Sequence, residues 1–123
     1  MSEPKILELT PEQETKNMKK TKLYKSIRQD LLDQLDRSFT VGSYYTDLIE
    51  DYMDMWVSKN LAIRDIQKRG VMVGYNNGGG QCGKKKNDSV DVQIKLNAQM
   101  LKILSELNIK PSQGDGADDG DEL

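Results

Sequence analysis

Apolar residues recur at helical spacing along most of this chain. Over residues 21–37 they return every four positions, at Leu23, Ile27, Leu31 and Leu35, which predicts a helix with one apolar face. Ahead of it, the run TPEQ at residues 10–13 has the capping residue, the early proline and the glutamine of a helix start. The N-terminal part is therefore predicted to hold a short helix followed by a longer one.

A longer helical pattern begins after Ser43 and ends before Gly70. Its apolar positions trace one face, and acidic residues occupy the other. The apolar face carries Tyr45, Leu48, Ile49, Tyr52, Trp56, Ile63 and Ile66. This pattern predicts a helix of about 25 residues, roughly twice the usual length in globular proteins.

The next stretch, VMVGYNNGGGQCGKKKND at residues 71–88, loses the helical spacing. Val71, Val73 and Tyr75 alternate with smaller residues, and the asparagines and glycines that follow are typical of turns. Two interpretations fit this stretch: a short β-hairpin and a glycine-rich flexible loop.

The last helical pattern covers residues 89–107 and carries two apolar rows. Asn87, Asp88 or Ser89 is predicted to cap its start. The first row consists of Val90, Ile94, Leu101 and Leu104, and the second row consists of Leu96, Met100, Ile103 and Leu107. A surface helix needs a single apolar stripe, so two rows need two partners.

The preceding long helix accounts for one row, and two interpretations remain for the other. The N-terminal helix would give a monomeric three-helix bundle, whereas a second copy of the chain would give a homo-oligomer, which we favour. Asn97 lies between Ile94 and Leu101, where a polar residue can fix register and copy number. The alternative for Asn97 is the exposed edge of a wide stripe.

These elements predict an all-α fold, with an antiparallel pair of long helices, an N-terminal helical segment, and a glycine-rich loop or short β-hairpin between the long helices. We expect three parts along the chain. They are a basic N-terminal segment over residues 1–42, a helical-hairpin oligomerisation core over 43–110, and a disordered acidic tail over 111–123.

The composition lacks the residues that most catalytic sites use. The chain has no histidine and one cysteine, Cys82, so the commonest general base and metal ligand are missing and no intrachain disulfide can form. No stretch reaches the ~18 apolar residues of a membrane span, and the N-terminus lacks the apolar core of a secretory signal. We expect a non-enzymatic protein without cofactor or metal in a reducing cytoplasm.

The run GGGQCGKK at residues 78–85 nearly matches the phosphate-binding pattern G-x-x-x-x-G-K-[ST]. Lys85 stands where the pattern requires a hydroxyl group for magnesium, and no strands of a parallel sheet accompany it. We therefore predict no nucleotide hydrolysis at this stretch.

Charge divides the chain into a basic body and an acidic end. The net charge is -2, yet residues 1–110 carry 18 bases and 15 acids, and residues 111–123 carry five acids and no base. The candidate DNA-binding cations are Lys16, Lys19, Lys20, Lys22, Lys25, Arg28, Lys84, Lys85 and Lys86. We favour contact with the DNA backbone, and the alternatives are a solvated basic helix and a solubilising loop.

Four segments between about residues 23 and 111 carry a recognisable order: IRQDLLDQLDRSF, YYTDLIEDYMDMW, DIQKRG with its glycine-rich excursion, and NDSVDVQIKLNAQMLKILSELNIKP. In this order they resemble small terminase subunits of tailed bacteriophages. Family members often show Asn-Pro-Ser ahead of the last helix, where this chain has Asn87, Asp88 and Ser89.

The resemblance implies a DNA-packaging component without enzymatic activity, acting in the host bacterial cytoplasm. Such proteins assemble into homo-oligomeric rings, bind double-stranded phage DNA, and pass it to a large subunit with the ATPase and nuclease. The implied contacts between copies are Tyr45, Leu48, Tyr52, Trp56, Ile94, Asn97, Leu101 and Leu104. The acids implied at the large subunit are Asp118, Asp119, Asp121 and Glu122.

Two other classes remain open from the residues alone. One is a helical transcription regulator with a helix-turn-helix-like arrangement, although the chain offers no short recognition helix between Arg37 and Gly42. The other is a coiled-coil interaction protein that binds no nucleic acid.

Overall fold

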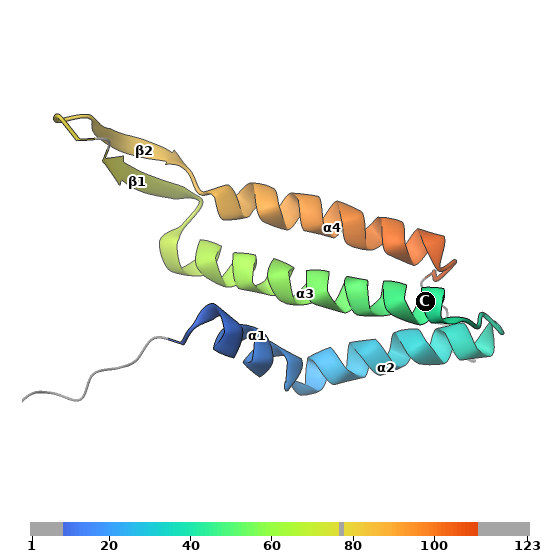
Figure 1. The fold of residues 1–123 in the computed structure, drawn as a ribbon. Coiled ribbons are helices and arrows are strands. Elements are labelled where there is room, and N and C mark those ends of the chain that lie inside the picture. Colours follow the sequence, from blue (N-terminus) through green and yellow to red (C-terminus); the bar gives the residue numbers. More distant parts are fainter. Residues whose placement is uncertain (1–8, 77, 111–123) are drawn as a thin grey trace, which may run out of the picture.

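The computed structural model describes residues 9–76 and 78–110, which form four helices and one two-stranded sheet (Figure 1). The helices are α1 (Pro11–Lys19), α2 (Lys22–Arg37), α3 (Ser43–Arg69) and α4 (Asp88–Glu106). Strands β1 (Met72–Asn76) and β2 (Cys82–Lys86) join α3 to α4 as an antiparallel hairpin. The mostly helical architecture is confirmed, and the hairpin is the correct interpretation of residues 71–88.

The helices begin and end close to the positions that the sequence predicts. The Thr10 hydroxyl accepts a hydrogen bond from the Gln13 N–H at 3.1 Å, and the Gln13 side chain accepts one from the Thr10 N–H at 2.9 Å. Gly70 ends α3 with φ of 91°, a conformation that suits a residue without a side chain. Asn87 caps α4 by accepting a hydrogen bond from the Ser89 N–H at 3.0 Å.

The long helix α3 forms the centre of the helical body. Figure 1 shows α4 along one side of it, and α1 and α2 along the other. Ile49 and Met53 on α3 are fully buried, since neighbours cover them on both sides. The complete core cluster consists of Met18, Tyr24, Leu31, Leu35, Ile49, Met53, Trp56, Val57, Met100 and Leu107.

The two apolar rows of α4 have different surroundings. Met100 and Leu107 from the second row are only 2% exposed, because α3 covers them. Ile94 and Leu101 from the first row are 62% and 59% exposed. The preceding helix therefore covers one row, as predicted. The three-helix-bundle alternative for the other row is wrong, because α2 packs on α3 and leaves Ile94 and Leu101 exposed.

The β-hairpin projects from the end of the body where α3 ends and α4 begins (Figure 1). Its register pairs Met72 with Lys86 and Tyr75 with Gly83. The Tyr75 ring lies over Gly83, where an added Cβ would stand only 3.0 Å from the tyrosine Oη. Gly83 therefore lets the aromatic ring cover the opposite strand, a known way to stabilise a glycine in a sheet.

Candidate subunit and nucleic-acid interfaces

The exposed face of α4 forms an apolar strip that we call the α4 stripe: Ile94, Ala98 and Leu101. Ile94 and Leu101 lie seven residues apart, about two helical turns, so they point to the same side. Asn97 is exposed at the edge of this stripe. The stripe is absent from the intramolecular core, so it is available to another molecule.

The other residues proposed for subunit contacts are less accessible. Trp56 is 7% exposed and packs edge-to-face on Tyr24, with 5.8 Å between the ring centroids. Burial also raises the pKa of the Tyr52 hydroxyl. The partly buried members that pack against the core are Tyr45, Leu48, Tyr52 and Leu104. Ile94, Asn97 and Leu101 are thus the exposed members, and the whole assignment stays a prediction.

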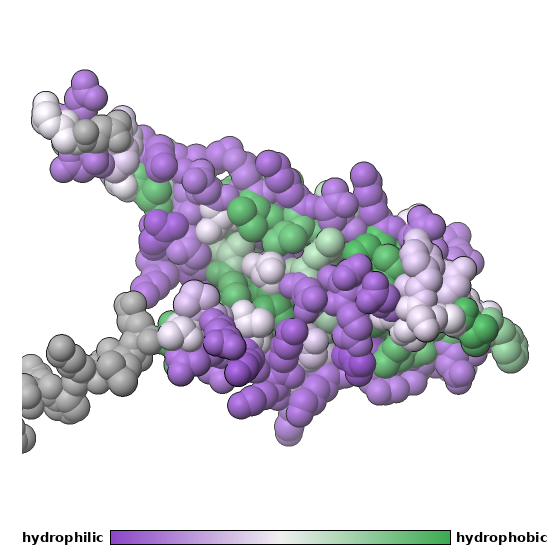
Figure 2. Space-filling model, viewed as in Figure 1, coloured by the Kyte–Doolittle hydropathy of each residue, from purple (hydrophilic) through white to green (hydrophobic). Residues whose placement is uncertain are grey.

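A second apolar surface lies at the connection between α2 and α3, and we call it the α2–α3 corner: Phe39, Val41 and Tyr44. These side chains are 88%, 78% and 59% exposed. Figure 2 shows hydrophobic surface at this tip of the molecule and in a band between α3 and α4. This surface was not predicted from the sequence, although Phe39 and Val41, two large apolar residues in the loop before Gly42, were a usable signal.

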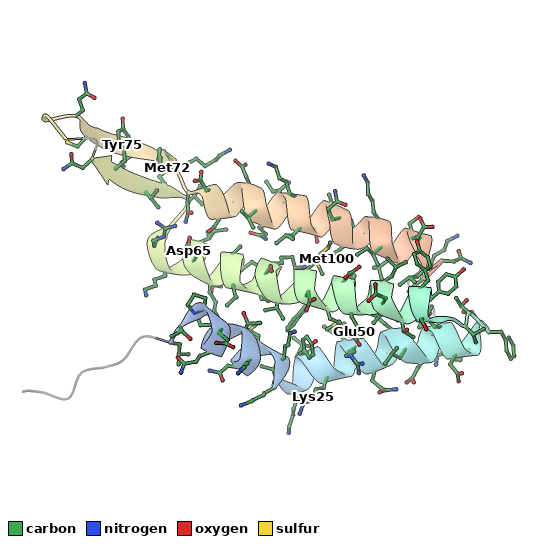
Figure 3. All side chains as sticks on the ribbon, in the orientation of Figure 1. Lys25, Glu50, Asp65, Met72, Tyr75 and Met100 are labelled. Atoms are coloured by element: carbon green, nitrogen blue, oxygen red, sulfur yellow. The ribbon has the colours of Figure 1, made fainter. Side chains whose placement is uncertain are left out.

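Two cations of the predicted DNA-binding segment form ion pairs with acids on α3. Lys19 lies 3.2 Å from the Asp54 carboxylate. The Arg28 Nε donates to the two Glu50 oxygens at 3.0 and 3.2 Å, and Glu50 lies between α2 and α3 in Figure 3. The hydrogen bonds that Lys19 and Arg28 donate to these carboxylates raise the pKa of both side chains. These two cations therefore help to hold the N-terminal helices on α3.

The remaining lysines at the α1–α2 junction are available. Lys20, Lys22 and Lys25 are exposed and form no ion pair with the residues that the structure describes. Lys25 points away from α3 in Figure 3. Lys16 is also exposed and pairs weakly with Glu12 at 3.7 Å. This junction therefore carries uncompensated positive charge that is exposed to solvent.

The hairpin is a second basic part of the molecule, and no acid occurs in residues 71–87. Lys84 and Lys85 are neighbours on β2, so they project to opposite faces of the hairpin. Lys86 instead pairs with Asp91 at the start of α4, at 2.9 Å. The candidate DNA contacts of the hairpin are thereby reduced to Lys84 and Lys85.

A polar cluster fixes the base of the hairpin, and the sequence analysis recognised only its capping residue. The fully buried Asn87 donates to the Asp65 carboxylate and to the Gly70 carbonyl, both at 3.0 Å. Asp65 also accepts from Arg69 at 2.7 Å and from the Ser89 hydroxyl at 2.7 Å. These hydrogen bonds, with that of Arg69 the largest cause, hold the pKa of Asp65 well below its usual range.

The described residues hold no candidate metal site. They contain no group of three metal-ligating side chains, and none of their helices is long and apolar enough to cross a membrane. One hollow of about 680 Å³ is an open depression between α2 and α3 where Arg28 is already paired with Glu50. Asp118, Asp119, Asp121 and Glu122 lie outside the described residues.

The fold and these surfaces define a helical scaffold with exposed apolar and basic faces. The chain belongs to the phage terminase small subunit family, whose model matches residues 24–117. That match covers most of α2 together with α3, the hairpin and α4. The family supports a role in phage DNA packaging, and it is generally non-catalytic because the ATPase and nuclease belong to the large subunit. No curated protein and no solved structure matches the chain.

Proposed function

We propose that this chain is a DNA-binding small terminase subunit that assembles with copies of itself, recognises phage DNA, delivers it to the large subunit and regulates that subunit in the host cytoplasm. The observation that carries the DNA-binding part is the group of unpaired, exposed lysines at the α1–α2 junction. Like charges gathered on one surface attract a polyanion and release its counterions on binding.

DNA binding is tested by fluorescence anisotropy with labelled double-stranded DNA over a series of salt concentrations. Changing Lys20, Lys22 and Lys25 together to Gln should weaken binding and reduce the slope of log affinity against log salt by about 2–3, because each phosphate contact contributes about 0.9. A matched control removes three exposed cations elsewhere: Arg64, Lys68 and Lys110 to Gln. Equal effects of the two triple variants would show that binding does not use the α1–α2 junction.

The hairpin lysines test whether DNA contacts a second surface. Lys84→Gln with Lys85→Gln should reduce the same slope by up to about 2 and leave the thermal unfolding temperature unchanged, since both side chains are exposed. Lys86→Gln is the matched single control, because Asp91 already compensates its charge. An unchanged slope in the double variant would remove the hairpin from the proposed DNA surface.

The acids near the C-terminus are proposed to contact the large subunit. Changing Asp118, Asp119, Asp121 and Glu122 to their amides should abolish stimulation of the large subunit's ATPase and leave DNA affinity unchanged. A matched control converts four exposed acids elsewhere to their amides: Glu12, Asp51, Asp88 and Glu106. Full stimulation by the C-terminal variant would place the contact on another part of the chain.

A further inference from the structure

Two helices of this protein end in the same unusual backbone conformation with very different residues. Asn108 follows the end of α4 with φ of 57°, and Phe39 follows the end of α2 with φ of 56°. Left-handed φ values suit glycine and asparagine at this position and are unfavourable for a bulky residue. Phe39 is also 88% exposed. Within the subunit, this phenylalanine therefore has a backbone cost and little compensating burial.

The neighbours of Phe39 extend its exposed surface. Val41 and Tyr44 leave most of their surface in water, so the α2–α3 corner presents three large apolar side chains together. Exposed aromatic groups of this kind commonly anchor protein interfaces, where burial stabilises the complex instead of the free subunit. The backbone outlier at Phe39 supports the same interpretation, because strain is retained where a function uses it.

Charge distinguishes the two exposed apolar surfaces. Around the α2–α3 corner, residues 29–49 contain four acids and one base. Beside the α4 stripe lie two exposed lysines, Lys95 and Lys102. The nearest acids on α4 are Asp91, which already pairs with Lys86, and Glu106 at the end of the helix. The two lysines are seven residues apart and therefore border the stripe along the same side of α4. The corner and the stripe are thus apolar at their centres and carry opposite charges at their margins.

We infer that the α2–α3 corner of one copy docks on the α4 stripe of the next copy, an inference that rests on the proposed self-assembly. Opposite marginal charges favour this pairing, whereas two stripes facing each other in antiparallel orientation would bring the lysines of both copies together. Because the two surfaces differ, the contact is head-to-tail: each subunit uses its corner toward one neighbour and its stripe toward the other. Such contacts close into a ring when the rotation between neighbours divides a full turn.

The test uses two full-length variants, each with one surface removed. The corner variant carries Phe39→Gly and Val41→Ser. Glycine suits the φ of residue 39, so this variant should keep its fold. The stripe variant carries Ile94→Gln and Leu101→Gln, which places good helix formers at exposed positions of α4. Thermal unfolding of each variant checks the fold, and native mass spectrometry measures assembly alone and after mixing.

Each variant alone should be a monomer of about 13.9 kDa, because each lacks one half of the contact. An equimolar mixture should form heterodimers and nothing larger, since the intact stripe of the corner variant meets the intact corner of the stripe variant. A corner variant that assembles like the native chain would overturn the inference. A corner variant that forms dimers beside a monomeric stripe variant would also overturn it, in favour of contacts between two stripes.

The native chain separates this inference from the proposal on which it rests. A monomeric native chain at high concentration would overturn self-assembly itself, and the docking inference with it. A native assembly whose two variants fail to form heterodimers on mixing would overturn only the pairing of corner with stripe.

Discussion

In the helical body, Ile49 and Met53 lose all contact with water, whereas in the hairpin only Val73 among the strand residues is even partly buried. Apolar burial stabilises the body, because α1, α2 and α4 all cover α3. The hairpin has no such core, and an isolated two-stranded sheet is marginally stable in water. Its backbone pairing and the Tyr75–Gly83 contact hold its shape.

The polar cluster around Asn87 connects these two regions. It links the end of α3 at Asp65 and Arg69 to the start of α4 at Ser89, directly at the base of the hairpin. The body and the hairpin are therefore stabilised by separable interactions: a buried apolar core in the body and backbone pairing in the hairpin. The sequence of the hairpin is therefore free to serve binding, whereas that of α3 is constrained by packing on two sides.

The largest effect is expected from a cavity in the body. Met53→Ala should reduce the free energy of unfolding by about 2–5 kcal/mol, because the side chain is fully buried and its removal leaves unfilled space. Urea denaturation followed by circular dichroism measures the change. Met72→Ala in the hairpin is the matched control, and its 52% exposure predicts a change within about 0.5 kcal/mol. Similar losses of stability in both variants would contradict the difference between a buried body and an exposed hairpin.

The connecting cluster should show an intermediate effect. Asn87→Ala should reduce the free energy of unfolding by about 1–3 kcal/mol, because it removes the hydrogen bonds that this buried side chain donates to Asp65 and Gly70 and the cap that it provides for the Ser89 N–H. The same denaturation experiment measures this loss, and hydrogen exchange should show faster exchange at the β1 and β2 amides. Asn17→Ala, at an exposed position on α1, is the control and should change little.

Acid should weaken the cluster through Asp65. Its pKa is lowered in the folded state, so the carboxylate contributes stability above the unfolded pKa of about 3.9, and this contribution is lost progressively as the pH falls below that value. Thermal unfolding between pH 2 and pH 7 should show a shallower acid decline for Asp65→Asn. Asp51→Asn provides an exposed control. An acid decline identical to that of the native chain would exclude Asp65 as a cause.

The smallest effect on the body is expected from removing the hairpin itself. Replacing residues 72–86 with a short glycine-serine linker should change the free energy of unfolding of the helices by less than about 0.5 kcal/mol, because loop length alone has a small entropic cost. Residues 71 and 87 are retained, so the hydrogen bond between the Asn87 N–H and the Val71 carbonyl can persist. Loss of the helical signal in this variant would show that the hairpin supports the body.

Local features were predictable from the sequence, whereas the partners across the fold were not. The caps at Thr10 and Asn87 depend on residues within three positions, so the sequence predicted the first and limited the second to Asn87, Asp88 or Ser89. The ion pairs of Lys19 and Arg28 join residues far apart in the chain, so charge spacing alone made these cations look available for DNA. Asp65 was missed for the same reason, although Arg69 four residues later was a local signal.

The apolar rows of α4 show both the strength and the limit of periodicity. It identified correctly that one helix could not cover both rows. Periodicity did not show on which side of α3 the helix α2 would pack. Packing beside α4 and packing on the opposite side of α3 would both bury the apolar face of α2. The α2–α3 corner was missed because Phe39, Val41 and Tyr44 lie across a helix boundary, where neither helical nor strand spacing applies.

The chain has one tryptophan and one cysteine, and the two regions hold one each. Trp56 packs against Tyr24, so its emission should shift to longer wavelength when α2 leaves α3 and water reaches the indole. Cys82 is an exposed thiol on β2, to which a dye can be attached without disturbing the helices. A single labelled sample would therefore report melting of the body in one optical channel and movement of the hairpin in the other.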